Sequence, residues 1–438
     1  MTIKMKDSGI KWIGMIPEGW NVLKLKSCYS FGKGLSITKA DLCEQGLGVI
    51  SYGQVHSKDN IGASVRESLI RYLPFDHVSL SDNSRVSIND LIFADTSEDL
   101  EGCGNCIFID SENVKYAGYH TIILHPKTKE TSRYFGYLFA TDAWKTQVRE
   151  NASGVKVYSI TQDMLKNAYL LAPPIETQYQ IVSFLDAKCA EIDALIAAKA
   201  KSNTLLKEYR QSIIFEAVTK GLDPNVPMKD SGIEWIGMIP EGWGLERLKY
   251  HAVLNPNIVL PSLSDDSDVT FIPMDHLKKG YHMKSTTTYE KVKKGYVIFE
   301  NNDILMAKVT PCLENGNLAI ASQLINGIGF GSTEINVIRC KCIENKYLYY
   351  LLQCDGYINK ATYEMYGVAG LKRLDPSFIP NSLIPIPPQS DQQRIVSFLD
   401  AKCAEIDVLI EANEKTINQL KEYRQSVIFE AVTGKMEV

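Results

Sequence analysis

Two stretches of this chain each occur twice, almost letter for letter, while the sequence between the copies is not repeated. The short repeats Met5–Trp20 and Met228–Trp243 differ at one position of sixteen. The longer repeats read IVSFLDAKCAEID from Ile181 and from Ile395, and each continues to LKEYRQS-IFEAVT near its end. A solenoid needs three or more short repeats. Two copies of about 215 residues instead predict pseudo-two-fold symmetry within one chain, with one scaffold carrying two different inserts.

The longer repeats have the pattern of two long helices. No Gly or Pro occurs between Pro174 and Gly221, or between Pro388 and Gly434. A helix of this length spans about 68 Å and needs a partner of equal length to bury its apolar stripe. The obvious partner is its own copy, which predicts an antiparallel coiled coil inside the chain. Lys199 and Asn413 interrupt the apolar seam. They are either a polar layer that sets the register or solvated edge positions, and the sequence favours neither.

The predicted fold class is α+β, with two mixed α/β target domains separated by the two long helices. Strand composition occurs in both inserts, at 86–94, 121–125, 297–299, 304–307 and 334–339, and helical patterns occupy 133–149 and 346–363. The predicted divisions are a short repeat (1–20), the first insert (21–173), the first helix (174–221), a joint with the second short repeat (222–243), the second insert (244–387) and the second helix (388–438).

Charge does not point to nucleic acid by itself. The net charge is −5, and the inserts are nearly balanced, with 16 basic and 17 acidic residues in 21–172 and 15 and 14 in 244–386. Nucleic-acid binders usually have a basic balance, so DNA binding would need local patches or charge from a partner. No run of eighteen apolar residues and no signal-peptide pattern at the N-terminus are present. These features predict a cytoplasmic protein that does not contact a membrane.

Sequence motifs for catalysis are missing. No phosphate-binding loop, catalytic tetrapeptide of adenine methylation, Ser/His/Asp arrangement or HExxH motif occurs. The glycines of Gly327–Gly331 run directly into a strand pattern instead of a helix. The ten cysteines include a CxxC at Cys103 and Cys106 and a CxC at Cys340 and Cys342, but zinc usually needs two well-spaced pairs. We therefore expect no catalytic residue, no metal site and no cofactor bound by this chain.

The long repeats carry a family resemblance. In both copies a diproline leads into a helix with a Gln-containing start and an I-x-x-F-L-D core, reading ETQYQIVSFLD from Glu176 and SDQQRIVSFLD from Ser390. The first helix is followed by a second W-I-G-M-I-P-E-G-W segment. This arrangement closely resembles the specificity subunit of type I restriction–modification systems, over essentially the whole chain. Many members have a Glu-Gln pair at the helix start, where this chain has Thr177-Gln178 and Gln392-Gln393.

The resemblance implies a non-catalytic reader of double-stranded DNA, in which each insert recognises one half of a split, asymmetric site. The helices would dock two modification subunits that methylate adenine with S-adenosylmethionine. Restriction subunits would add ATP- and Mg-dependent translocation and cleavage. Two rival interpretations are a self-contained restriction or methylation enzyme, which lacks the motifs it needs, and a coiled-coil adaptor whose two domains bind ligands other than DNA. The implied subunit contacts are Gln178, Tyr209, Arg210, Phe215, Gln392, Gln393, Tyr423, Arg424 and Phe429.

Candidate DNA contacts follow from side-chain chemistry, because base reading needs donors and acceptors on loops and phosphate binding needs Lys, Arg or hydroxyl groups. The densest basic run, around Lys278–Lys294, is either a phosphate-binding patch or a solvated face. The turn around Gln54 could equally be a solvated turn, and the acidic residues of Glu98–Glu101 would repel phosphate. The predicted DNA-binding residues are Tyr52, Gln54, His56, Thr96, Ser97, Lys156, Tyr158, Lys278, Lys279, Lys284, Lys308, Thr310, Lys372 and Arg373.

Overall fold

The computed structural model describes residues 4–77, 80–128, 133–368 and 370–438, and it divides into two compact units. Unit 1 comprises Met1–Lys199 and Lys415–Val438, and unit 2 comprises Ala200–Glu414. Residues 1–3 of the first predicted division, 1–20, lie outside the described residues. Each unit therefore combines one insert with half of each long helix, so the units cross the divisions predicted along the sequence.

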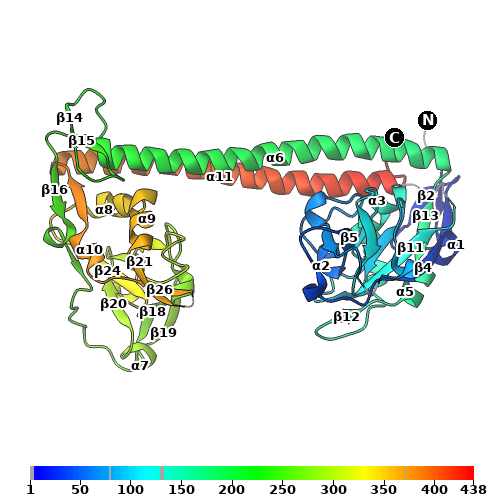
Figure 1. The fold of residues 1–438 in the computed structure, drawn as a ribbon, viewed down its shortest axis with the longest axis horizontal. Helices are drawn as coiled ribbons and strands as arrows, with labels where there is room; N and C mark the ends of the chain where they lie inside the picture. The colour runs from blue at the N-terminus through cyan, green and yellow to red at the C-terminus, as the bar shows by residue number, and fades with distance from the viewer. Residues whose placement is uncertain (1–3, 78–79, 129–132, 369) are drawn as a thin grey trace. The chain divides into compact units, whose positions relative to one another are not determined.

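The two predicted helices are present as α6 (Ile175–Lys220) and α11 (Gln389–Val432), which Figure 1 shows in green and red. In unit 1 the start of α6 shares a core with the end of α11, and in unit 2 the end of α6 shares a core with the start of α11. The predicted antiparallel pairing is thus confirmed within each unit. The seam residues are Ile181, Leu185, Cys189, Val427, Ile428 and Val432 in unit 1, and Ile214, Val218, Ile395, Leu399 and Cys403 in unit 2.

Glycines end both helices at equivalent places. Gly221 and Gly434 have φ values of 76° and 68°, the left-handed conformation that terminates helices. A Cβ atom on Gly434 would lie 2.6 Å from Pro17, and one on Gly221 would lie 3.1 Å from Trp243. The first short repeat therefore packs on the end of α11, while the second packs on the end of α6. Near-identical sequences thus build the same helix end in both units.

A polar layer interrupts the helix seam in unit 2. The Asn413 side chain is buried, and its Nδ2 donates to Asn203 Oδ1 at 2.8 Å and to Ser202 Oγ at 3.4 Å. Of the two interpretations that the sequence left open for Asn413, the structure supports the polar layer. Asn203 is the partner that sequence analysis missed. Lys199 is half-buried.

Unit 1 is built from small sheets that are antiparallel except for the parallel pair of β5 and β10. The four-stranded sheet has the order β4-β11-β7-β9, and the three-stranded sheet has the order β10-β5-β6. The strands are β1 (Met5–Asp7), β2 (Met15–Pro17), β3 (Asn21–Lys24), β4 (Tyr29–Lys33), β5 (Leu47–Ile50), β6 (Arg71–Leu73), β7 (Leu91–Ala94), β8 (Thr96–Ser97), β9 (Cys106–Phe108), β10 (Val114–Ala117), β11 (Thr121–Pro126), β12 (Tyr158–Ser159) and β13 (Tyr169–Ala172). The short helices are α1 (Leu25–Cys28), α2 (Tyr52–Val55), α3 (Tyr134–Ala140), α4 (Asp142–Arg149) and α5 (Gln162–Asn167).

Unit 2 repeats this plan with a different second sheet. Its β17-β24-β21-β22 sheet matches β4-β11-β7-β9, and its other sheet has the order β19-β18-β23-β20. The strands are β14 (Met228–Asp230), β15 (Met238–Pro240), β16 (Gly244–Arg247), β17 (Ala252–Leu254), β18 (Asp268–Ile272), β19 (Ser285–Thr288), β20 (Val297–Glu300), β21 (Ile304–Ala307), β22 (Leu318–Ile320), β23 (Ile328–Gly331), β24 (Ile335–Cys340), β25 (Met365–Val368), β26 (Leu371–Leu374) and β27 (Leu383–Ile386). The short helices are α7 (Tyr289–Val292), α8 (Asn345–Leu352), α9 (Asp355–Tyr363) and α10 (Phe378–Asn381).

Three predicted segments are divided or shorter than the sequence pattern suggests. The helix expected over 346–363 is divided into α8 and α9, which are separated by Gln353 and Cys354. The helix expected over 133–149 is broken at Thr141, whose Oγ1 accepts from Trp144 N at 3.3 Å and caps α4. The strand expected over 86–94 begins only at Leu91. A tight turn precedes it, in which Asp90 Oδ2 accepts from Ser87 N at 2.8 Å. At Thr141 and at Asp90, hydrogen bonds from a side chain to the nearby backbone compete with the regular backbone hydrogen bonds of the helix or strand.

Each insert is fixed to the long helices by a buried tyrosine. Tyr134 Oη donates to the carbonyl of Val432 at 2.8 Å in unit 1, and Tyr347 Oη donates to that of Val218 at 2.9 Å in unit 2. These carbonyls belong to the last turns of α11 and α6. Carbonyl groups in the last turn of a helix have no hydrogen-bond partner within that helix. Within the described ranges, no helix is both long enough and apolar enough to span a bilayer.

Candidate nucleic-acid interface

The structure brings together most of the residues predicted in the first insert. β12 pairs with β8, which places Tyr158 opposite Ser97. The α2 segment lies beside this pair, and the Tyr52 ring is 6.2 Å from the His56 ring, edge to face. Tyr52, His56 and Ser97 line a hollow of about 480 Å³. Residues that are far apart in sequence therefore form one surface region of unit 1.

His56 has a positioning role in this region. Its Nε2 lies 2.8 Å from the carbonyl oxygen of Thr96, so this nitrogen carries the proton and donates. Its Nδ1 then accepts from Asn105 Nδ2 at 3.2 Å, and Asn105 Oδ1 accepts from Lys145 Nζ at 2.7 Å. Burial lowers the pKa of Lys145. Both ring nitrogens of His56 form hydrogen bonds inside the unit. His56 therefore holds β8 in place and has no ring nitrogen left to bond to a DNA base. Sequence analysis missed Asn105 and Lys145, because nothing local links them to His56.

The rim of the same hollow is partly acidic. Glu98 and Glu101 are exposed there, and Asp99 Oδ1 accepts from Gly102 N at 2.6 Å and closes the loop. Gln54 also makes a local bond, since its Oε1 accepts from Ser51 N at 3.1 Å and caps α2. Lys156 stands apart on the exposed segment between Ser153 and β12. The basic and acidic side chains of this region therefore lie on different loops.

The second insert also gathers residues predicted separately. Thr310 Oγ1 donates to the carbonyl of Gly370 at 2.7 Å and accepts from Lys372 N at 3.0 Å. The carbonyl of Lys308 accepts from Leu374 N at 2.8 Å. The loop after β21 is thereby bonded to the β25–β26 hairpin. Ala369, between β25 and β26 in sequence, lies outside the described residues. The hydroxyl of Thr310 is engaged inside the unit, so its role is to hold the hairpin.

Two predicted basic groups in this insert have acidic or amide partners. The Arg373 guanidinium pairs with the Glu334 carboxylate, with Nε donating at 3.1 Å. Lys284 Nζ donates to the Gln323 side chain at 3.1 Å. The lysine run is also interrupted along the chain, because β19 lies between the segment of Lys278, Lys279 and Lys284 and the lysines around α7. The patch is therefore less continuous than its sequence spacing suggested.

The CxxC motif lies in the core of unit 1. Cys103 and Cys106 are buried, and burial raises the pKa of Cys106 to about 12. Burial also raises the pKa of Cys340 to about 12. Metals bind the thiolate form, which these thiols disfavour at neutral pH. In the part of the chain that the structure describes, no group of three or more His, Cys, Asp or Glu residues is arranged to hold a metal ion.

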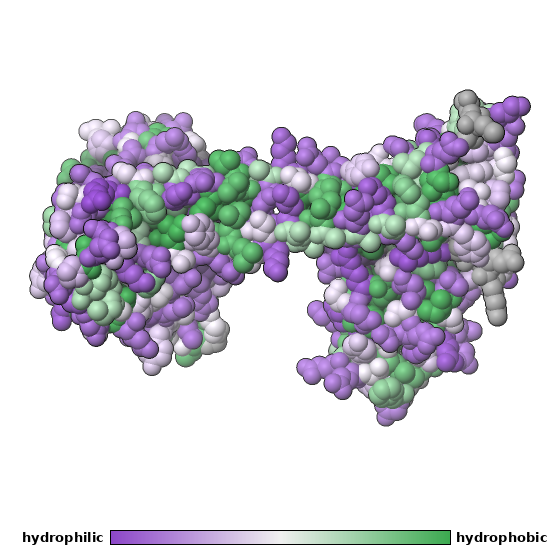
Figure 2. All heavy atoms as spheres, turned by 90° about the horizontal axis from the view of Figure 1, so that it is seen from above, coloured by the Kyte–Doolittle hydropathy of each residue, from purple (hydrophilic) through white to green (hydrophobic). Residues whose placement is uncertain are grey.

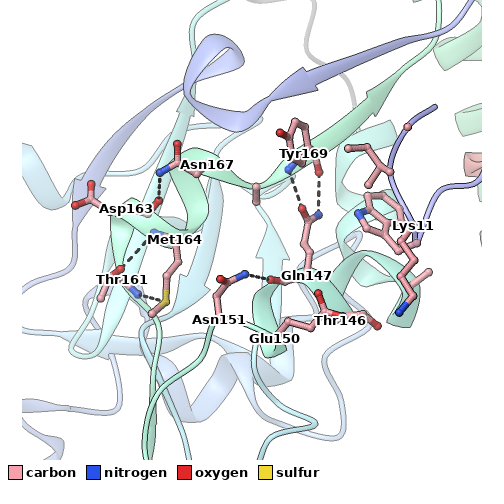
Figure 3. Close-up of a pocket in the computed structure, with 15 residues that line it drawn as sticks. Lys11, Thr146, Gln147, Glu150, Asn151, Thr161, Asp163, Met164, Asn167 and Tyr169 are labelled. Atoms are coloured by element: carbon pink, nitrogen blue, oxygen red, sulfur yellow. Dashed lines mark hydrogen bonds between the residues drawn. The ribbon is translucent and has the colours of Figure 1, made fainter.

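A second hollow of unit 1, about 880 Å³ in volume, lies between the first short repeat, α4 and α5 (Figure 3). Its side chains mainly hold neighbouring backbone. The Gln147 amide accepts from Tyr169 N at 2.8 Å and donates to Tyr169 O at 2.9 Å, and Asn151 Nδ2 donates to the carbonyl of Gln147 at 2.8 Å. These bonds fix β13 beside α4. The polar side chains of this hollow therefore serve to hold unit 1 together.

The predicted subunit contacts divide into buried and exposed residues. The amides of Gln178 and Gln392 are buried and donate to the carbonyls of Pro173 and Pro387, each at 2.9 Å. We correct the expectation that these two glutamines face a partner, because their buried amides bond to a proline just before each helix, inside each unit. Tyr209, Tyr423 and Gln393 are exposed, and Phe215 and Phe429 are half-buried.

The two predicted arginines connect the long helices. Arg210 Nη1 lies 2.6 Å from Asp407 in unit 2, and Arg424 Nε lies 3.4 Å from Asp193 in unit 1. These equivalent ion pairs link α6 to α11 and help to set their register. Other exposed apolar side chains occur on both helices, and Figure 2 shows hydrophobic residues alternating with hydrophilic ones along them. They are Tyr179, Leu195, Leu205, Phe398, Val408 and Leu409.

Comparisons with known proteins agree on one family. The model of the type I restriction modification DNA specificity domain matches residues 17–203 and 255–422. The EcoAI specificity subunit of Escherichia coli is 39% identical over 163 residues, which cover 36% of this chain and 27% of that protein. This chain thus aligns with about a quarter of the length of that relative. The StySPI specificity subunit of Salmonella potsdam is 20% identical over 97% of this chain and 90% of its own.

A solved structure shares the fold. It was described in work on complex assembly and conformational transition of the type I R-M system. It has a TM-score of 0.69 at 16% identity and covers 96% of this chain and 99% of its own. Together, the doubled fold and the two matched domains agree with the resemblance seen in the repeated helices. The chain belongs to the family of type I restriction–modification DNA specificity subunits.

Proposed function

We propose that this chain is the DNA-reading subunit of a type I restriction–modification complex, and that each insert reads one half of a split, asymmetric site. The observation that carries this proposal is the doubled architecture of the chain. Near-identical residues fix both inserts to the helices through Tyr134 and Tyr347, while the loops remote from the helices differ. A scaffold that keeps its attachments and varies its loops is suited to holding two independent readers.

The repeated helices support docking of two copies of one partner. Tyr209 and Tyr423 occupy equivalent positions in identical LKEYRQS segments, and both side chains are half exposed or more. Two identical surfaces bind two copies of the same protein, and exposed apolar side chains in such surfaces favour an interface. We propose that these partners are two modification subunits, which supply S-adenosylmethionine and methylate adenine. Restriction subunits then supply ATP, Mg and cleavage, while this chain is non-catalytic and acts in the cytoplasm.

The near-neutral inserts favour one alternative, an adaptor whose domains bind something other than DNA. One experiment separates the two functions. The chain is co-expressed with candidate modification subunits, the complex is purified, and the methylome of the cells is sequenced. A stable complex and a split adenine-methylated motif are expected. A stable complex without new methylation would favour the adaptor.

A further inference from the structure

Each unit has a short segment with two aliphatic side chains that are more than half exposed. Finger 1 consists of Ser153–Ser159, in which Val155 is 92% exposed and Val157 is 52% exposed. Finger 2 consists of the paired strands β25 and β26, without Ala369, and in it Val368 is 83% exposed and Leu371 is 78% exposed. Exposed side chains of this kind add little to folding, because they bury little surface. Their repeated occurrence on projecting segments therefore points to a contact with another molecule.

Finger 1 is held firmly at its base. Ser159 N donates to the carbonyl of Ser153 at 2.8 Å, and Ile160 N donates to that of Asp95 at 2.8 Å. Gly154 has a φ of 143°, and a Cβ there would lie 2.0 Å from the carbonyl oxygen of Val157. Only glycine fits this close approach. The segment is therefore a built hairpin with a defined shape, and Figure 1 shows its β12 strand on the side of unit 1 remote from α6.

Finger 2 uses the same device with a different sequence. Gly367 has a φ of 146°, and a Cβ there would lie 2.2 Å from the carbonyl oxygen of Leu371. Val309 forms an isolated β-bridge with Arg373, so the base of the hairpin rests on the residues that follow β21. Finger 1 rests in the same way on β8, which follows β7. The unlike inserts thus support an equivalent finger at an equivalent strand end.

The chemistry of the fingers is also shared. Lys156 lies between the two valines of finger 1, and Lys372 follows Leu371 in finger 2. Of the four predicted DNA-binding residues in the fingers, Lys156, Lys372 and Arg373 are basic and Tyr158 is aromatic, although the inserts as a whole are nearly neutral. The Arg373 guanidinium is paired with Glu334, so each finger has one lysine available for phosphate. Alternation of apolar and cationic side chains matches a DNA groove, in which base edges accept apolar contacts and phosphates line the rim.

We propose that each finger enters a groove of DNA and places its apolar side chains against base edges, while its lysine contacts phosphate. This inference rests on the proposed function, and it makes Val155, Val157, Val368 and Leu371 specificity-determining residues. Finger 1 serves the half-site of the first insert and finger 2 that of the second.

The test measures DNA binding by the full chain assembled with its modification subunits, on cognate and non-cognate duplexes at several salt concentrations. The variants are V155A/V157A and V368A/L371A. Matched controls are F75A and V259A, whose side chains are 75% and 93% exposed outside the fingers. Each finger variant is expected to lose cognate affinity roughly tenfold, the effect of about one unread base pair. Non-cognate affinity and the salt slope stay unchanged, because apolar contacts release no counterions.

The lysine variants K156A and K372A give the complementary result. Each is expected to weaken both duplexes alike and to reduce the salt slope by up to about 0.9. The inference is refuted if V155A/V157A and V368A/L371A keep their affinity for the cognate duplex, or if they lose equal affinity for both duplexes. Loss of subunit assembly with intact DNA affinity would instead make the fingers protein contacts. A wild-type complex that fails to bind DNA would refute the proposed function itself, and the inference with it.

Discussion

Asp90 in the first insert and Asp303 in the second lie at the same point, in the tight turn before the central strand of their sheet. Each carboxylate accepts from a backbone N–H three residues earlier, from Ser87 at 2.8 Å and from Glu300 at 2.7 Å. Their partners on the adjacent strand differ. Asp90 meets His125 Nδ1 at 2.9 Å, whereas Asp303 receives two bonds of 2.7 Å from Arg339. Both inserts have the same turn, but the residue on the adjacent strand that bonds to its aspartate is histidine in the first insert and arginine in the second.

The contacts between inserts and helices show the opposite behaviour. Tyr137 Oη donates to Asp186 at 2.6 Å, and Tyr350 Oη donates to Asp400 at 2.7 Å. The pKa of both tyrosines is raised, mainly by burial and to a smaller extent by the hydrogen bond to the aspartate. The residues that join an insert to the helices are thus preserved between the units, while those within the sheets and loops are free to change. This difference is what a scaffold with exchangeable readers requires.

The largest expected effect comes from exchanging a whole insert. Replacing Asn21–Ala172 with the insert of another family member should change one half of the methylated site completely and leave the other half intact. The physical reason is that equivalent tyrosines, Tyr134 and Tyr347, attach the two unlike inserts to the helices, so we expect the new insert to bring an equivalent attachment. Methylome sequencing reads both halves at once. A change in both halves together would show that the inserts do not read independently.

The divergent carboxylate partners predict unequal stability losses. Arg339→Ala leaves the buried Asp303 carboxylate without its cation, which should lower the free energy of unfolding by about 3 kcal/mol. His125→Ala removes a single bond to Asp90 and should lower it by about 1 kcal/mol. Urea denaturation monitored by circular dichroism measures both. R373A is the control, because its ion pair with Glu334 lies at the surface and should contribute less than about 1 kcal/mol. Equal losses for R339A and H125A would remove the proposed difference between the sheets.

The long helices, the repeats and the mixed inserts could be predicted because they depend on patterns along the chain. Gly221 and Gly434 mark the helix ends in the sequence, because the left-handed backbone conformation at those positions favours glycine. The candidate site was predictable only in part. Thr310 and Lys372 were chosen separately, and the structure joins them. The positioning role of His56 could not be predicted, because its partner Asn105 lies 49 residues away. Burial of Gln178 depends equally on the fold, and a single sequence does not reveal it.

The asparagine pair distinguishes the helix seam of unit 2 from a purely apolar one. Asn413→Leu leaves Asn203 buried without its partner and should lower the free energy of unfolding by about 1–2 kcal/mol. The double variant N203L/N413L removes both polar groups and should recover most of that loss, at the expense of register specificity. Thermal unfolding gives the stability, and size-exclusion chromatography detects misregistered or associated species. A double variant that is less stable than N413L would show that the two asparagines stabilise unit 2 beyond meeting each other's need for a hydrogen bond.

The smallest expected effect concerns the lysines of the second insert, which the structure shows to be partly engaged within the chain. Lys279 Nζ lies 3.9 Å from the Asp355 carboxylate, and Lys284 donates to Gln323. Changing Lys278, Lys279 and Lys284 to Ala should therefore weaken binding alike across DNA sequences and reduce the salt slope, by up to about 0.9 for each phosphate that is no longer neutralised. Because two of the three ammonium groups already have partners, we expect a total reduction well below the maximum for three phosphates. Titrations at several salt concentrations give the slope, and K156A provides the comparison with a lysine of the first insert that is exposed at the surface. A slope unchanged by the triple substitution but reduced by K156A would assign phosphate binding to the fingers and leave the lysine run as a solvated face.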